Sequence, residues 1–138
     1  MQDRIYSAPV MDWFLTTLGN DPQFKQVEPY EGQFEDASDF VILPPSIFIA
    51  LDRCVNNAER EMDLDYSVSL YVCTAHVHGT DPGGILDLLD YLINSLHAQP
   101  VRIFNPDTYF GRCFYSGYEW LGIFPGFACY KISFTIKG

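Results

Sequence analysis

The sequence predicts an α+β fold in a single domain spanning residues 1–138, with a mainly antiparallel sheet and two helices packed on one of its faces. Two segments repeat apolar residues at about the helical period of 3.6, and several others alternate apolar and polar residues with the period of two that is typical of strands. Short connections between the strand segments predict antiparallel pairing. Apolar residues make up 48% of the chain, which is enough to fill a core between helices and sheet.

The N-terminal part is expected to form one helix followed by a polar segment. Apolar residues recur at about one helical turn over residues 8–18. Ser7 is suited to the N-cap position, and Pro9 is tolerated because amides in the first turn have no partner within the helix. Residues 20–39 contain several acidic side chains and two prolines. We expect them to form an extended, solvated loop with a little strand.

Two strands are expected in the middle of the chain, over residues 46–54 and 65–77. The first segment is rich in β-branched and aromatic residues, which favour strands. In the second, apolar residues alternate with mostly polar ones from Tyr66 to Cys73, so one face of this strand is expected to be buried. The polar residues 56–61 between them are typical of a hairpin connection.

The clearest helical pattern covers residues 85–96, where the apolar residues form one stripe and Asp87 and Asp90 lie on the other side. Asp81 is suited to the N-cap of this helix, with Pro82 as its first residue. Three further strands are expected over residues 101–104, 109–120 and 126–137.

The charge balance excludes some classes of partner. Eight Lys and Arg residues stand against 18 Asp and Glu residues, giving a net charge of −10. The cations are scattered along the chain, whereas binding to nucleic acid or to anionic lipid needs them clustered. We therefore expect neither a nucleic acid nor a membrane as a partner. No apolar stretch is long enough to span a bilayer, and no signal peptide is indicated.

The four cysteines indicate a reducing compartment. Cys54, Cys73, Cys113 and Cys129 form no C-x-x-C pair, and three of them lie within apolar, strand-like segments. We interpret them as reduced, partly buried thiols of a cytosolic protein rather than as a disulfide framework.

A weak candidate metal site lies at the end of the second expected strand. The alternation of a strand places His76 and His78 on one face, and Asp81 is close enough in sequence to supply a third ligand. A structural metal site needs four ligands, and the chain offers no further Cys or His at the usual spacing. We therefore favour the interpretation that these are two histidines at a strand end that bind no metal. We expect no cofactor and no catalytic residues.

Aromatic residues gather near the C-terminus, and strand alternation cannot place all of them in one core. Exposed aromatic side chains are typical of protein interfaces. The segment therefore predicts an oligomer interface, with these candidates: Tyr109, Phe110, Tyr115, Tyr118, Trp120 and Phe124.

The order of these elements resembles the small tail-terminator and tail-completion proteins of tailed phages, in particular a Mu-like family of uncharacterised phage proteins. The resemblance covers residues from about 40 to 137, including the segments Pro45–Leu51, Gly79–Gly84 and Tyr130–Ile136. The acidic residues 28–39 and the aromatic residues 109–127 depart from the family pattern, and no catalytic motif accompanies the likeness.

The resemblance implies a structural virion protein rather than an enzyme. Such a protein forms a closed ring, expected to hold six copies, that caps the tail tube and joins it to a head-completion or connector protein. Its location would be the virion or the cytoplasm of the bacterial host. Two alternatives stay open: a small-ligand-binding α+β domain with an aromatic-lined pocket, and a metal-dependent enzyme that uses His76 and His78.

Overall fold

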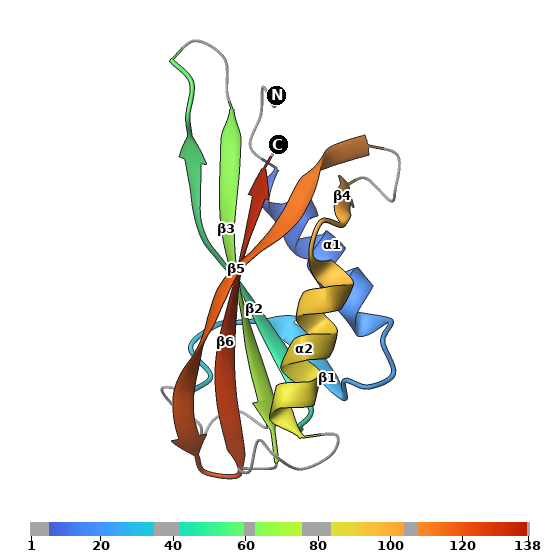
Figure 1. The fold of residues 1–138 in the computed structure, drawn as a ribbon, viewed down its shortest axis with the longest axis vertical. Coiled ribbons are helices and arrows are strands. Elements are labelled where there is room, and N and C mark those ends of the chain that lie inside the picture. The colour runs from blue at the N-terminus through green and yellow to red at the C-terminus, as the bar shows by residue number, and fades with distance from the viewer. Residues whose placement is uncertain (1–5, 35–41, 60–62, 76–83, 104–107, 138) are drawn as a thin grey trace.

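A strongly twisted six-stranded sheet, accompanied by two helices, makes up the described part of the chain (Figure 1). The computed structural model describes residues 6–34, 42–59, 63–75, 84–103 and 108–137. The α+β fold class is therefore confirmed. The elements in chain order are α1 (Ser7–Gly19), β1 (Gln26–Pro29), β2 (Ser46–Asn56), β3 (Leu64–Thr74), α2 (Ile85–Leu96), β4 (Pro100–Ile103), β5 (Thr108–Phe124) and β6 (Phe127–Lys137).

The sheet is mixed, with one parallel pair among antiparallel ones. The strands lie in the order β1-β2-β3-β6-β5-β4. Every neighbouring pair is antiparallel except β1 and β2, where residues 26–29 run parallel to residues 46–49. The expectation of a mainly antiparallel sheet is consistent with this arrangement. The little strand expected within residues 20–39 is β1.

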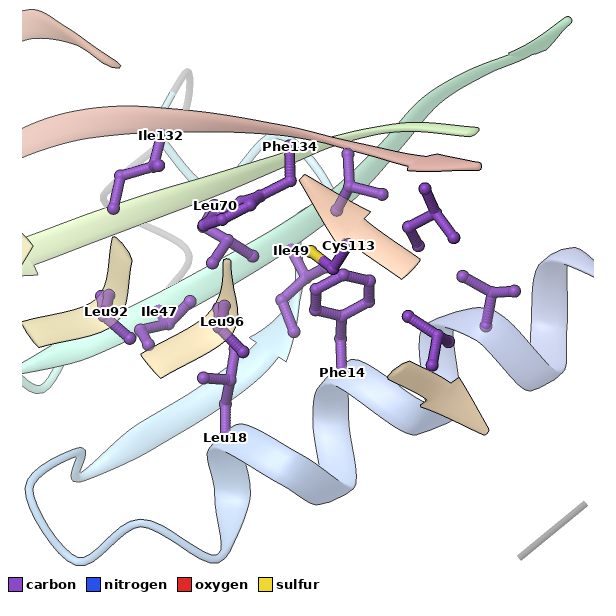
Figure 2. Close-up of a cluster of buried hydrophobic side chains, with 14 of the residues drawn as sticks. Phe14, Leu18, Ile47, Ile49, Leu70, Leu92, Leu96, Cys113, Ile132 and Phe134 are labelled. Atoms are coloured by element: carbon purple, nitrogen blue, oxygen red, sulfur yellow. The ribbon is translucent and has the colours of Figure 1, made fainter. Parts of the chain in front are cut away.

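The main hydrophobic cluster joins both helices to the sheet. Figure 2 shows Phe14 and Leu18 of α1 and Leu92 and Leu96 of α2 directed toward strand residues such as Ile47. In β3, the residues from Leu64 to Val72 that alternate at the period of two belong to this cluster, as the sequence pattern predicted. Ile132, Phe134 and Ile136 of β6 follow the same rule.

The starts of both helices differ from the sequence prediction. Helix α1 begins at Ser7 with Tyr6 as N-cap, and no side chain caps it. The Ser7 hydroxyl instead hydrogen-bonds the Tyr66 hydroxyl, which also accepts the Tyr6 amide at 2.9 Å. Helix α2 begins at Ile85 with Gly84, not Asp81, at the N-cap. Two consecutive glycines disfavour helix, so the helix starts after them.

The residues after β1 correct the prediction of a solvated loop over residues 20–39. Tyr30 and Phe34 pack on the face of the sheet opposite the main cluster, and the Gln33 side chain is buried with its amide donating to the Pro29 carbonyl at 3.0 Å. The second cluster that they join is built around buried side chains from three strands: Phe48, Cys73, Phe127 and Cys129. Residues 35–41, which carry much of the acidic charge, lie outside the described residues.

Candidate assembly surface

The six aromatic candidates divide between the core and the surface of β5. Phe110 is fully buried and contacts Tyr66 with ring centroids 5.4 Å apart, so the structure removes it from the candidate interface. Tyr115 and Phe124 are half-buried, each packed against one of the two clusters. The remaining three are about half exposed: Tyr109 at 48%, Tyr118 at 51% and Trp120 at 46%.

The side of the sheet and the position along β5 together explain this division. Phe110 and Cys113 belong to the main hydrophobic cluster, and both are fully buried. Tyr118 and Trp120 pair with Ile132 and Tyr130 of β6, which places them on the helix side of the sheet. Both side chains are nevertheless exposed, so no described residues cover this side of the sheet at their positions. We call residues 116–124 the β5 arm.

The β5 arm carries apolar side chains that the aromatic pattern alone did not single out. Leu121 is 37% exposed and Ile123 is 66% exposed. Tyr130 of the neighbouring strand lies between the two exposed aromatic rings, 5.7 Å from Tyr118 and 5.0 Å from Trp120 between ring centroids. The three rings form one continuous group, and Leu121 and Ile123 add further exposed apolar side chains to the same arm.

Among the described residues, the arm is also an open edge of the sheet. Strand β4 pairs only with residues 108–112 of β5. The chain just before β4 continues this pairing: the Cys113 amide donates to the Gln99 carbonyl at 3.0 Å, and the Tyr115 amide donates to His97 Nδ1 at 3.0 Å. Beyond Tyr115, no described strand other than β6 pairs with β5.

The charges around the arm are few. Glu119 approaches Lys131 with an O–N distance of 3.8 Å, and its side chain is 65% exposed. An exposed pair of this kind contributes little to stability. Both residues lie on the side of the sheet opposite Tyr118 and Trp120, because side chains alternate along the paired strands. One face of the arm is therefore apolar and the other carries a weakly held carboxylate.

The candidate metal ligands His76, His78 and Asp81 lie outside the described residues. Among the residues that are described, no group of three or more His, Cys, Asp and Glu side chains is arranged to hold a metal ion.

The cysteines are free, as predicted, and Cys73, Cys113 and Cys129 are buried while Cys54 is half-buried. Burial raises the pKa of the Cys113 thiol to about 12. The pKa of Cys129 is also raised, first by a hydrogen bond with Cys73 and then by burial. Thiols with raised pKa values hold little thiolate at neutral pH, so these two are poor nucleophiles.

A comparison with protein-family models gave no match, and a search of curated proteins found none that is similar to this chain. Across the described residues, neither helix has the length and hydrophobicity needed to cross a membrane.

Proposed function

We propose that this protein is a structural subunit, not an enzyme, and that it assembles with copies of itself into a closed ring. The ring is a tail-terminator or tail-completion component of a phage or prophage virion, expected to hold six copies. It caps the tail tube and offers its other surface to the head connector. In each subunit, both helices cover one face of the sheet.

The exposed apolar surface of the β5 arm is the observation that carries this proposal. Eight large hydrophobic side chains are exposed among the described residues, and four of them lie in the arm. Scattered exposed hydrophobic residues need no explanation, but a contiguous patch on an open strand edge favours association. A partner that covers the arm removes both the apolar surface and the unpaired backbone from water.

The shape of the sheet supports a subunit with two distinct ends. The β2–β3 hairpin projects from one end of the sheet and the β5–β6 hairpin from the other (Figure 1). A ring that joins a tube to a connector needs two different surfaces, and a heterologous contact between identical subunits preserves that polarity around the ring. The net charge of −10 opposes random contacts between copies and favours contacts made where charge is sparse.

Negative-stain microscopy of the purified protein, alone and mixed with tail tubes of the same phage, tests the proposal. The expected result is a ring with a central opening, and tubes that end in an additional ring of density. Particles with the size of a single subunit, together with tubes that remain bare, would contradict it.

A further inference from the structure

Within the part of the chain that the structure describes, the sheet has two half-open edges at opposite corners. On the β5 side, the arm at residues 116–124 is open because β4 covers only the other end of the strand. On the β2 side, β1 pairs with residues 46–49, and the Tyr30 amide donates to the Ile49 carbonyl at 2.8 Å. No described strand pairs with the outer edge of residues 51–56, which we call the β2 arm.

The directions of the two arms suit pairing between neighbouring copies. Strand β2 is antiparallel to β3, β3 to β6, and β6 to β5, so β5 is antiparallel to β2. A rotation that carries one subunit to the next in a ring preserves the direction of strands that run along the ring axis. It also keeps the helix side of the sheet facing the same way. The β5 arm of one copy therefore meets the β2 arm of the next as an antiparallel pair, the arrangement that gives straight inter-strand hydrogen bonds.

The side chains of the two arms are complementary on the helix side. Leu51 and Cys54 of the β2 arm pair with Val68 and Tyr66, which places them on that side, and both are only half-buried. Tyr118 and Trp120 of the β5 arm lie on the same side and are exposed. Pairing the arms brings apolar side chains against apolar side chains, as in cross-strand pairs within one sheet.

Charges are complementary on the other side. Arg53 pairs with Ser67, on the side opposite the main cluster, and is exposed. Glu119 lies on the same side of the β5 arm, and its one ion pair with a described residue is the long contact with Lys131. Asp52 also lies in the β2 arm, and it accepts a hydrogen bond from the Ser69 hydroxyl of its own subunit. Arg53 is thus the cation available to Glu119 of a neighbouring copy.

Building on the proposed ring, we propose that its subunits are joined by antiparallel pairing of the β5 arm of one copy with the β2 arm of the next, with Glu119 facing the neighbour's Arg53. Because the arms lie at opposite corners, each copy is displaced along the strands relative to its neighbour. A closed sheet accommodates such a stagger by tilting its strands relative to the ring axis.

Charge reversal tests this pairing with variants R53E, E119K and the double variant R53E/E119K. Sedimentation velocity over a range of concentrations measures the association of each. Both single variants should weaken association about fivefold per contact, and the double variant should recover it, as expected for an exposed pair worth roughly 1 kcal/mol. R102E changes an exposed cation on β4, away from both arms, and should associate like the unaltered protein.

Each other outcome overturns the pairing and separates it from the proposed function. If rings form equally well in all variants, the proposed ring stands and the pairing of the two arms is refuted. Disruption by E119K alone, without effect of R53E, indicates that β5 arms pair with each other. A protein that stays monomeric at all concentrations refutes both proposals. Hydrogen exchange adds a second readout, since the outward-pointing amides of both arms, which do not bond to β6 or β3, should become protected only on association.

Discussion

Removing the Trp120 ring is expected to weaken association between subunits more than it destabilises the subunit. Trp120 is 46% exposed, so about 100 Å² of its surface is available to a partner. Covering that area at ~25 cal/mol per Å² stabilises the contact by about 2.5 kcal/mol. The cost of ordering side chains at an interface reduces this stabilisation to about 2 kcal/mol. Its loss in Trp120→Ala corresponds to a roughly 30-fold larger dissociation constant.

Sedimentation velocity of Trp120→Ala and of the control Tyr109→Ala provides the assay. Tyr109 is 48% exposed and lies on the same strand, but outside the β5 arm, so its loss should leave association unchanged. Within the subunit, Trp120→Ala removes a ring contact with Tyr130 at 5.0 Å, worth about 0.5–1.5 kcal/mol, and the melting temperature should fall only slightly. Equal weakening by both substitutions, or by neither, would refute the assignment of the interface to the arm.

Three further predictions concern the two clusters and the cysteines. Phe34 contacts the aromatic rings of five other residues in the second cluster. Phe34→Ala should therefore lower the free energy of unfolding, measured in urea, by about 3 kcal/mol. A loss below about 1 kcal/mol would mean that residues 30–34 do not cover the sheet. Iodoacetamide at pH 8 should modify Cys54 before Cys113, because burial both shields the Cys113 thiol and raises its pKa to about 12; mass spectrometry that finds Cys113 modified first would contradict this. Since that folded pKa lies above the ordinary value of 9.0, the folded protein holds the Cys113 proton more tightly. The stability contributed by the protonated Cys113 thiol is complete below pH 9 and is lost as the pH rises toward 12. The free energy of unfolding should therefore fall between pH 9 and 12, and this fall should be less steep in Cys113→Val.

Local pattern was sufficient for most of the helices and strands. The alternation of β3 and β6 identifies the residues that face the main core, because the period of a strand depends only on neighbouring residues. The ends of the elements depended on less local effects. Ser7 was expected to cap α1, but Tyr66 of β3, distant in sequence, takes its hydroxyl as a partner. Strand β5 extends to Phe124, beyond the predicted end at residue 120, since pairing with β6 continues to the turn.

The second cluster depends on contacts that no local pattern contains. Tyr30 and Phe34 lie in an acidic segment whose composition favours solvent, yet their rings meet those of Tyr71 and Phe48 from neighbouring strands. The parallel pairing of β1 with β2 likewise joins segments with no periodic pattern in common. Such contacts are decided by which surface the folded sheet leaves uncovered.

For the candidate surface, the sequence indicated an excess of aromatic residues but not which of them are exposed. Neighbours Tyr109 and Phe110 differ completely in burial because they lie on opposite sides of one strand. Tyr118 and Trp120 share a side with buried residues, and their exposure follows from where the cover over the sheet ends. How far other parts of the chain extend over the sheet depends on the whole fold. The β2 arm, which carries no unusual composition, becomes notable only through the length of β1.

The mass of the protein in solution is the most direct test of the claim that this chain is a ring-forming subunit. Native mass spectrometry at micromolar concentration should give a single closed species of six copies of the 15.8 kDa chain, without a ladder of larger assemblies. A single chain at every concentration, or an open-ended series of masses, would contradict it.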